Sequence, residues 1–424
     1  MKESILHYVW QYRLFEATQL TTTRGDSVEV IDPGKLNTDA GPDFFNAKLK
    51  IDDTLWAGNI EIHNQSADWK KHNHQNDKAY DNVILHVVQK ADVDVFRSNG
   101  ELIPQMELAV PVDIQTRYDD LITSRKWIAC EDKIHQVPSI LISSWKTTLL
   151  TERLERKVAA IETMLSQSQN HWEDAFYISL ARSYGFSTNS HAFEAMARSL
   201  PLAVLAKHKD NIFQLEALLM GQAGFLEKPV EDKYPLELQK EYRFLQTKYG
   251  LNPIEVSQWK LLRLRPENFP TIRLAQFASL IHRSSKLFSL ILETPDCQDL
   301  RKLFDTEVSE YWQKHFLFGR ESRVSRKIMG NKSIDILLIN TVIPFIFAWG
   351  KKKNDENRTE QAIRLLEEIK PESNSIVHRW EKLGINCKSA FDSQALLELK
   401  KNYCEEKKCL LCRIGHKVLI INKQ

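Results

Sequence analysis

The sequence lacks the features that would place the protein in a membrane. The first residues, Met1–Phe15, mix charged and aromatic side chains and contain no apolar signal-peptide core. The most apolar run, Ile336–Trp349, is too short to span a bilayer and contains Pro344, which favours a buried core helix. We therefore expect a cytoplasmic protein with no membrane contact. The sequence does not indicate an oligomeric state.

Signatures of several common functional classes are also missing. There is no Gly-x-Ser-x-Gly nucleophile motif, which argues against a serine hydrolase. No segment matches a helix-turn-helix, an RNP element or a phosphate-binding glycine loop. Internal repeats and long disordered linkers are absent as well. The composition, 42% apolar and 27% charged residues, is typical of a soluble globular protein, and 424 residues are enough for two or three domains.

The net charge of +2 conceals an uneven distribution. Residues 301–424 hold 24 Lys and Arg against 16 Asp and Glu, whereas the remainder holds 34 against 40. A basic C-terminal third permits contact with nucleic acid, although solvated or ion-paired faces have the same composition. The candidate phosphate-contacting residues are Arg263, Arg265, Arg320, Arg323, Arg326 and Lys327.

The chain changes character near residue 136, and together its parts predict an α+β protein. Residues 1–135 predict a helix, strands, a helix and a further strand, in the segments Ile5–Phe15, Ser27–Asp32, Asp43–Ile51, Trp56–His63, Ser66–Asp81, Val83–Val88 and Pro104–Val110. Residues 136–385 carry apolar residues at helical spacing and predict a mostly α-helical domain. Its expected helices are Ser144–Ser166, His171–Tyr184, Ser190–Ser199, Ile212–Gln222, Leu236–Tyr249, Thr271–His282, Leu300–Lys314 and Arg358–Ile369, with Gln394–Tyr403 following. We expect the cysteine-containing segment 386–424 to pack on the helical domain.

Two short phrases in the N-terminal part suggest chemistry. Gly41-Pro42-Asp43-Phe44 begins one expected strand, and Ile60-Glu61-Ile62-His63 ends the next, with Asp52-Asp53 as the turn between them. Alternation places Glu61 and His63 on one face of their strand. A two-stranded ribbon would bring Asp43 to them. Two carboxylates and a basic nitrogen are suited to a hard divalent cation and an activated water.

This arrangement resembles the PD-(D/E)XK nuclease-like superfamily. The resemblance implies a restriction-endonuclease-like mixed sheet, Mg²⁺ bound by Asp43 and Glu61, and attack of water on a phosphodiester of DNA. His63 stands where that superfamily normally has a lysine. His63 can act as a general base or a metal ligand, and Lys48 or Lys70 can supply the missing charge. Alternatively the fold is kept without catalysis, as a nucleic-acid-binding or interaction protein.

A second polar cluster follows and offers a different metal site. It consists of Asp68, Trp69, His72, His74, Asp77, Tyr80 and His86. His72 and His74 would not share a face on a helix, whereas a loop can bring both to one ion. Three histidines with Asp68 and Asp77 near Glu61 permit Zn²⁺, Mn²⁺ or Ni²⁺ instead of Mg²⁺. The alternatives are a hydrated polar helix and, for His86, a buried histidine with satisfied hydrogen bonds.

Almost the whole chain also resembles a bacterial family of unknown function. This resemblance supports a single evolutionary unit and implies no activity. The passages that carry it are His7–Trp10, Gly41–Phe45, Trp56–His63, Asp68–His74, Tyr80–Val88, Leu262–Arg265, Asn268–Pro270 and the cysteine-rich end.

The cysteines gather near the C-terminus as Cys404-x4-Cys409-x2-Cys412. In a cytoplasmic protein such clustering favours metal or redox chemistry over disulfides. We expect Cys387, or else His416, as a fourth ligand. A tetrahedral zinc site and an iron–sulfur cluster are both compatible with four cysteines, and reduced unliganded thiols are the alternative.

Overall fold

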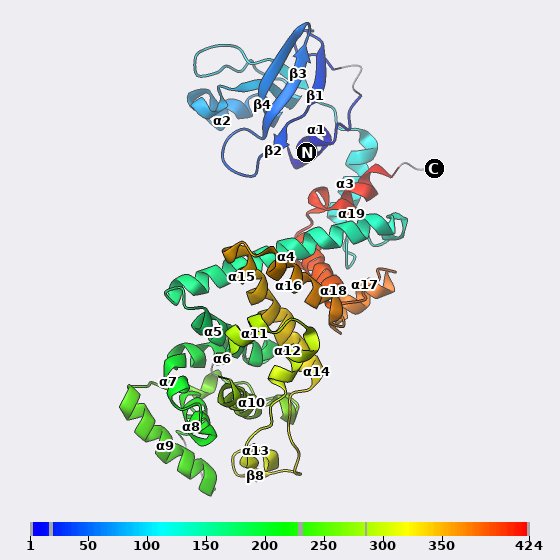
Figure 1. Cartoon of the computed structure of the whole chain (residues 1–424). Helices are drawn as coiled ribbons and strands as arrows, with labels where there is room; N and C mark the ends of the chain where they lie inside the picture. The colour runs from blue at the N-terminus through cyan, green and yellow to red at the C-terminus, as the bar shows by residue number, and fades with distance from the viewer. Residues whose placement is uncertain (1–2, 17–19, 228–231, 285, 422–424) are drawn as a thin grey trace. The chain divides into compact units, whose positions relative to one another are not determined.

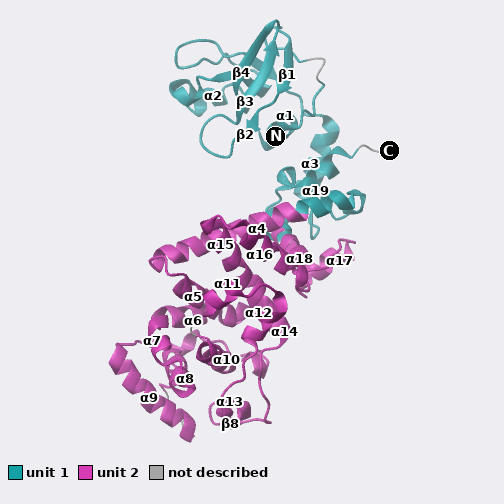
Figure 2. Ribbon diagram, in the orientation of Figure 1, with its two compact units in different colours: residues 1–145, 399–424 teal, residues 146–398 magenta. Residues whose placement is uncertain are grey.

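The computed structural model describes residues 3–16, 20–227, 232–284 and 286–421, and the chain divides into two compact units (Figures 1 and 2). Unit 1 comprises residues 1–145 and 399–424, and unit 2 comprises residues 146–398. Unit 1 contains a mixed sheet and unit 2 is mostly helical, so the predicted α+β class is confirmed. The chain passes between the units inside helix α4 (Ser139–Gln167) and again just after helix α18 (Ala390–Glu398).

The sheet of unit 1 has the strand order β1-β3-β4-β5-β6, with β2 paired to β3. Strands β3 and β4 are antiparallel, whereas β4–β5 and β5–β6 are parallel. The strands are β1 (Val28–Asp32), β2 (Lys35–Leu36), β3 (Phe44–Ile51), β4 (Thr54–Gln65), β5 (Val83–Lys90) and β6 (Gln105–Glu107). They lie within the segments predicted from alternation or extend them by a few residues, except β2, which was not predicted.

Burial within the sheet explains why these segments form strands. Strand β5 is buried at every position from Val83 to Val88, as its continuous apolar run predicts for a central strand. On β4, Ile60 and Ile62 are buried on one face while Glu61 and His63 are buried on the other. Helices α1 (Glu3–Gln11) and α2 (Asp68–Lys71) both contact β4. The polar side chains of Glu61 and His63 are therefore enclosed within unit 1, and the candidate site lies around them.

The segment Ser66–Asp81, predicted as one polar helix, is broken into three short pieces. Helix α2 is followed by two 3₁₀ turns, His74–Asn76 and Lys78–Tyr80. The break occurs at Asn73, whose φ of 65° is left-handed. Asparagine tolerates this conformation better than most residues do, so the helix ends there and the chain reverses.

Of the segment 386–424, which was predicted to pack on the helical domain, residues 386–398 belong to helical unit 2, whereas residues 399–424 belong to unit 1. Helix α19 (Arg413–Ile420) contacts helix α3 (Val112–Thr123), and Arg117 Nη1 donates to the carbonyl oxygen of Leu419 at 2.7 Å. The hydroxyl of Tyr8 lies 2.9 Å from Nδ1 of His416. Side chains from both ends of the sequence therefore complete one core. The boundary at 385/386 could not show this, because the pairing partners are hundreds of residues apart.

The described residues of unit 2 form helices, their connecting segments and one small two-stranded sheet, β7 (His315–Leu317) with β8 (Arg320–Glu321). The predicted helix 300–314 is interrupted by residues 305–309, which have no regular secondary structure and in which Thr306 and Val308 are buried. Its helices are α5 (Trp172–Tyr184), α6 (Phe186–Ser199), α7 (Leu202–Lys207), α8 (Ile212–Gln222), α9 (Lys233–Tyr249), α10 (Pro270–Arg283), α11 (Leu287–Glu293), α12 (Cys297–Phe304), α13 (Glu310–Lys314), α14 (Asn331–Leu337), α15 (Ile343–Lys353), α16 (Glu356–Glu368) and α17 (Ser375–Lys382), together with most of α4 and with α18.

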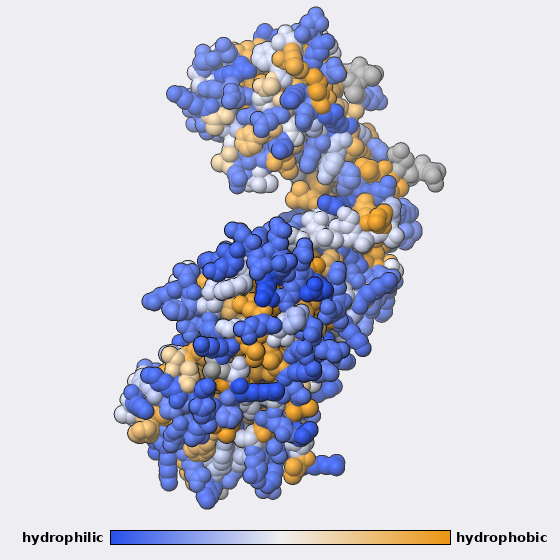
Figure 3. Space-filling model, viewed as in Figure 1, coloured by the Kyte–Doolittle hydropathy of each residue, from blue (hydrophilic) through white to orange (hydrophobic). Residues whose placement is uncertain are grey.

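The most apolar helical stretch runs through α14, a π-helical turn at Leu338–Val342, and α15. Within the described residues, 331–353 is long and apolar enough to cross a membrane, and 72% of its apolar window is buried inside the protein. That burial is what a core helix of unit 2 requires. On the face drawn in Figure 3, hydrophilic side chains predominate over this unit.

Candidate metal centre

Two central strands of unit 1 present three polar side chains side by side. In the parallel pairing of β4 with β5, Glu61 is the register partner of His86, and His63 follows two residues after Glu61. The exposed fractions of Glu61, His63 and His86 are 4%, 2% and 0%. Buried polar side chains need partners, and these three find them in one another and in the turn that follows α2.

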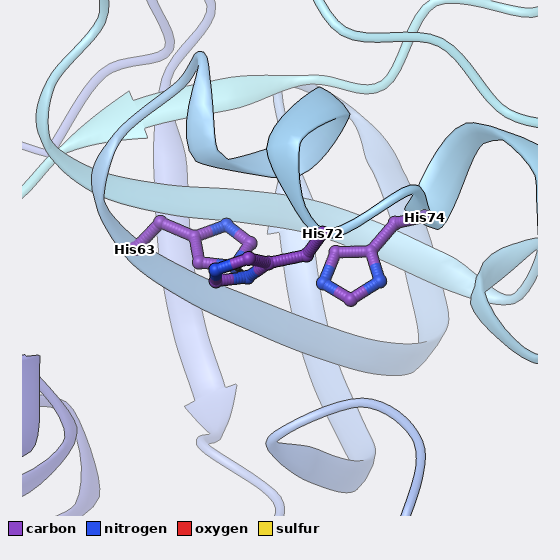
Figure 4. Close-up of side chains that lie close together, drawn as sticks. All are labelled: His63, His72 and His74. Atoms are coloured by element: carbon purple, nitrogen blue, oxygen red, sulfur yellow. Dashed lines mark hydrogen bonds between the residues drawn. The ribbon is translucent and has the colours of Figure 1, made fainter.

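The chain reversal at Asn73 brings His72 and His74 to the same place as His63. One potential ligand atom from each of these three histidines lies within 4.8 Å of the other two (Figure 4). His63 and His74 are buried, whereas His72 is exposed. The structure therefore has the loop arrangement, in which a turn brings His72 and His74 close together. An exposed ligand also leaves the site open to solvent from one side.

His63 is the centre of the cluster. Its Nδ1 lies 2.8 Å from His86 Nε2, and its Nε2 lies 3.1 Å from His72 Nδ1. Burial lowers the pKa of His63 to about 3, with the other histidines adding to the effect, and burial lowers the pKa of His86 to about 3 as well. Both rings are therefore neutral at physiological pH. A neutral imidazole is the form that binds a metal ion.

Glu61 supplies a carboxylate to the same cluster. Its Oε1 lies 3.3 Å from His74 Nε2 and 3.5 Å from His63 Nε2. Burial raises the pKa of Glu61, whereas the neighbouring His74 acts to lower it. The contact with His74 is close without being aligned as a hydrogen bond, because His74 Nε2 is buried and has no hydrogen-bond partner among the described residues. An unsatisfied imidazole nitrogen facing a carboxylate is the arrangement that a bound cation would complete.

Asp43 lies next to Glu61, as the two-strand ribbon predicts. The backbone N–H of Asp43 donates to Glu61 Oε2 at 3.1 Å, and the N–H of Ile62 donates to Asp43 Oδ2 at 2.9 Å. The predicted Asp43–Glu61–His63 constellation is therefore assembled on one face. However, one oxygen of the Glu61 carboxylate and one of the Asp43 carboxylate already accept hydrogen bonds from backbone amides. The histidine nitrogens are therefore more available as metal ligands.

Sequence reasoning missed His7, which helix α1 adds to the site. His7 Nε2 lies 3.3 Å from Asp43 Oδ2 and 3.9 Å from Glu3 Oε1. Burial lowers the pKa of His7, but the Asp43 carboxylate outweighs burial and raises it overall. The available signal was the spacing of Glu3 and His7 on an amphipathic helix, since residues i and i+4 share a helix face. What the sequence lacked was any indication that this face meets Asp43.

The donor set indicates the class of ion that fits. Three imidazole nitrogens with one carboxylate suit Zn²⁺, Mn²⁺, Fe²⁺ or Ni²⁺, whereas Mg²⁺ prefers an all-oxygen shell. His86 supports the set from behind, because its contact with His63 Nδ1 orients the ring and leaves Nε2 for an ion. The ring of Tyr80 stacks on His74 with centroids 3.8 Å apart, which fixes that ligand too.

The predicted nucleic-acid-contacting residues all lie in unit 2 and differ in availability. Arg263, Arg265, Arg320 and Arg323 are exposed, and Arg326 is exposed but paired with Glu307. Lys327 is buried, and its Nζ donates to the carbonyl oxygens of Trp312 and His315 at 2.7 Å each. That prediction is therefore wrong for Lys327, because its ammonium is committed to the protein's own backbone. Lys48 and Lys70, the alternatives for the missing lysine, are exposed.

The predicted cysteine ligands separate into two groups. Cys404, Cys409 and Cys412 lie in unit 1, whereas Cys387 lies in unit 2. Burial raises the pKa of the Cys387 thiol, Asp392 raises it further, and Lys146 opposes this. The alternative ligand His416 contacts Tyr8, and its ring also packs against Tyr12 with centroids 4.1 Å apart.

The comparison with known families places the chain. A family model described as a protein of unknown function (DUF2851) matches residues 3–375. The chain belongs to this family. No curated protein and no solved structure matches the chain. The predicted membership of a family of unknown function is thus confirmed, whereas the resemblance of the N-terminal part to PD-(D/E)XK nucleases stays a prediction. All of the clustered site residues, from His7 to His86, lie within the matched DUF2851 region.

Proposed function

We propose that unit 1 is a metal-dependent hydrolytic centre in which His63, His72 and His74 hold a transition-metal ion and Glu61 acts beside it. The observation that carries this proposal is the convergence of three histidine ligand atoms within 4.8 Å, next to a buried carboxylate. A bound ion of this class lowers the pKa of a water molecule and so supplies hydroxide at neutral pH. Magnesium at Asp43 and Glu61, the sequence-based prediction, is the competing ligand choice.

The protein's own groups would divide the proton transfers between the Glu61 carboxylate and the His7 imidazole. Glu61, with its pKa raised by burial, is suited to accept a proton from the attacking water. His7, with its pKa raised by Asp43, is suited to donate a proton to the leaving oxygen. One group is thus tuned as a base and another as an acid within a single cluster, which is a recurring arrangement in hydrolytic sites.

For the substrate we propose a phosphodiester, and DNA as its source. The support is the Asp43–Glu61 pairing that the nuclease-like pattern predicts, together with the exposed arginines of unit 2. Phosphodiester cleavage is also a reaction for which a metal-activated water and a proton donor are sufficient. The same centre without a substrate would make the chain a metal-binding protein, which the experiment below distinguishes.

The test is hydrolysis by the purified full chain of bis(p-nitrophenyl) phosphate and of single- and double-stranded DNA, with Zn²⁺, Mn²⁺ or Mg²⁺ added. We expect activity with Zn²⁺ or Mn²⁺ that is lost in His72→Ala and in Glu61→Gln. His135→Ala is the matched control, because His135 is an exposed histidine of the same unit. If the protein binds metal but cleaves no substrate with any of the three ions, the hydrolase proposal is overturned and the metal-binding protein is the function that remains.

The variant His63→Lys separates the two ligand choices. If His63 occupies the usual lysine position of a magnesium nuclease, lysine should preserve or raise Mg²⁺-dependent activity. If His63 is a metal ligand, the charged lysine should abolish metal binding, because an ammonium group has no lone pair to offer. Retained Mg²⁺-dependent cleavage by His63→Lys would therefore reject the histidine centre in favour of the Asp43–Glu61 site.

A further inference from the structure

Four cysteines from distant parts of the sequence are brought into unit 1. Cys130 lies in the turn after helix α3, and Cys404 ends the π-helical turn Leu399–Cys404. Cys409 begins a 3₁₀ turn, and Cys412 directly precedes helix α19. All four are reduced. Cys130 is more than 270 residues from the others, so no local sequence pattern groups it with them.

Electrostatic interactions connect the four sulfurs. Burial raises the pKa of Cys130 to about 12, and the next contributions come from Cys412 and Cys409. Burial also raises the pKa of Cys404, followed by contributions from Cys412, Cys130 and Cys409. Each thiol thus disfavours ionisation of the next. Two cations oppose this, Lys400 near Cys404 and Lys407 near Cys409.

The turn around Cys412 is built to receive a negatively charged sulfur. The backbone N–H groups of Ile414 and Gly415 donate hydrogen bonds to the Cys412 sulfur. The indole Nε1 of Trp145 is directed to the same sulfur, yet it is buried and has no hydrogen-bond partner of normal geometry among the described residues. Three N–H groups around a neutral thiol are more than a thiol can use, whereas a thiolate accepts them all.

A glycine makes this turn possible. A Cβ built on Gly415 would lie 2.1 Å from the carbonyl oxygen of Cys409, so any other residue would push the two cysteines of the Cys-x2-Cys pair apart. The segment is also fastened to the Cys130 side of the unit, because Lys407 Nζ donates to the carbonyl oxygen of Ser124 at 3.0 Å. These two contacts hold three chain segments together independently of the sulfurs.

We propose that Cys130, Cys404, Cys409 and Cys412 form a four-cysteine site for a structural zinc ion. Four thiolates match the tetrahedral preference of Zn²⁺, and a Cys-x2-Cys pair is a common half of such a site. The site would join the turn after α3 to both ends of the final segment. Cys130 replaces the fourth ligands expected from the sequence, because Cys387 belongs to unit 2 and His416 is engaged by Tyr8.

Binding requires the sulfurs to move closer together. Among the described residues, no three of these cysteine sulfurs lie within 4.8 Å of one another, as the ligand atoms of the three histidines do. A tetrahedral ion with Zn–S bonds of about 2.3 Å holds sulfurs about 3.8 Å apart. Zinc binding would also release the thiol protons, so its affinity would fall as the pH decreases.

The first test uses the unaltered full chain and distinguishes this site from the histidine centre. Co²⁺ bound by thiolates gives an intense sulfur-to-metal absorption that histidine ligands do not give. We expect that absorption with one equivalent of Co²⁺, and its loss on adding Zn²⁺. In parallel, zinc should protect Cys130, Cys404, Cys409 and Cys412 from alkylation, mapped by mass spectrometry, while Cys387 stays reactive. This arrangement needs no variant that might fail to fold.

The second test exchanges single cysteines. Cys130→Ser should abolish the sulfur-to-cobalt absorption, whereas Cys387→Ser, also partly buried, should leave it unchanged. Loss of the absorption in Cys387→Ser but not in Cys130→Ser would overturn the assignment. The absence of any sulfur-to-cobalt absorption in the unaltered chain would overturn the site itself. A brown protein containing iron and sulfide would overturn zinc as its ion.

Discussion

At the scale of single residues, histidines of one site have pKa values that are shifted in opposite directions. Burial keeps His63 and His86 neutral, with pKa values of about 3, whereas Asp43 raises the pKa of His7. The difference comes from the neighbours: His63 faces other imidazoles, while His7 faces a carboxylate 3.3 Å away. Neutral rings suit metal ligation, and a charged ring suits proton donation.

His7 therefore predicts a pH-dependent contribution to stability. A histidine whose folded pKa is raised stabilises the folded state fully below its unfolded pKa of about 6.5, and this contribution disappears as the pH rises through the folded value. We expect His7→Gln to lower the free energy of unfolding most at about pH 5.5 and least at alkaline pH. Urea unfolding of both proteins across this range, with a chelator present, measures the difference. A difference that grows toward alkaline pH would contradict the His7–Asp43 pairing.

His86 tests whether the support behind a metal ligand matters. His86→Phe keeps the ring volume but removes the contact with His63 Nδ1, so we expect metal affinity to fall by roughly 10–100-fold. His86→Gln retains a hydrogen-bonding group and should lose less affinity. Competition with a coloured chelator measures both variants. Equal affinities of His86→Phe and the unaltered protein would show that His63 needs no orienting partner.

At the scale of elements, the turn at Asn73 decides whether His72 and His74 meet. Asn73→Gly keeps a residue that adopts a φ of 65° freely, so we expect unchanged metal affinity. Asn73→Val opposes that conformation by roughly 1–2 kcal/mol, which corresponds to about a 5–30-fold loss of affinity if the turn relaxes in the metal-free protein. Titration of both variants with Zn²⁺ checks this. Similar affinities for Gly and Val would mean that the left-handed turn is not needed for binding.

The pair β4–β5 carries most of the site and approaches closely at Gly58. A Cβ built on Gly58 would lie 2.4 Å from Ile84 Cγ2 and 2.6 Å from the carbonyl oxygen of Asn82. Because one of these atoms is backbone, relief requires the strands to shift. We expect Gly58→Ala to reduce the free energy of unfolding by about 1–3 kcal/mol, measured by denaturant titration. Gly100→Ala, where a Cβ meets nothing within 4 Å, controls for steric crowding, although its positive φ adds some strain.

Elements with a repeating pattern were the predictable ones. The alternation around Glu61 and the apolar run of β5 identified both strands, and the expected helix Ile212–Gln222 coincides with α8. Failures occurred where one residue or a buried extended stretch overrides the pattern. Asn73 breaks a helix-compatible segment by adopting a left-handed conformation, and Thr306 and Val308 are buried in an irregular segment that interrupts the expected helix.

The candidate sites show the same division between local and long-range information. Asp43, Glu61 and His63 were found because a short hairpin joins them, and alternation fixes which way they point. His7 and Cys130 were missed because their roles depend on tertiary contacts with segments far along the chain. Nothing in a local pattern specifies which helix covers which strand. Side-chain burial, which sets every pKa described above, is equally a property of the folded unit.

At the scale of the whole molecule, unit 1 is built from both ends of the chain, with unit 2 inserted between them. The first helix and the last are directly joined through Tyr8 and His416, 2.9 Å apart. Such an arrangement makes the integrity of the N-terminal sheet dependent on residues 399–424. The proposed metal centre and the proposed zinc site then belong to one folding unit, even though their residues span the sequence from His7 to Cys412.

Removing residues 399–424 should therefore destabilise unit 1 while leaving unit 2 folded. The deletion eliminates the Tyr8–His416 contact and the Arg117–Leu419 hydrogen bond, and it exposes the apolar side of α3 that packs on α19. Since local stability depends on the contacts of each cooperative unit, hydrogen exchange should accelerate in α1 and α3. It should stay unchanged in α8 and α10, which contact each other inside unit 2. Mass-spectrometric hydrogen exchange on the full and shortened chains measures both regions at once. Unchanged protection of α1 would mean that the N-terminal sheet folds without the C-terminal segment, and the chain would then be a simple succession of domains.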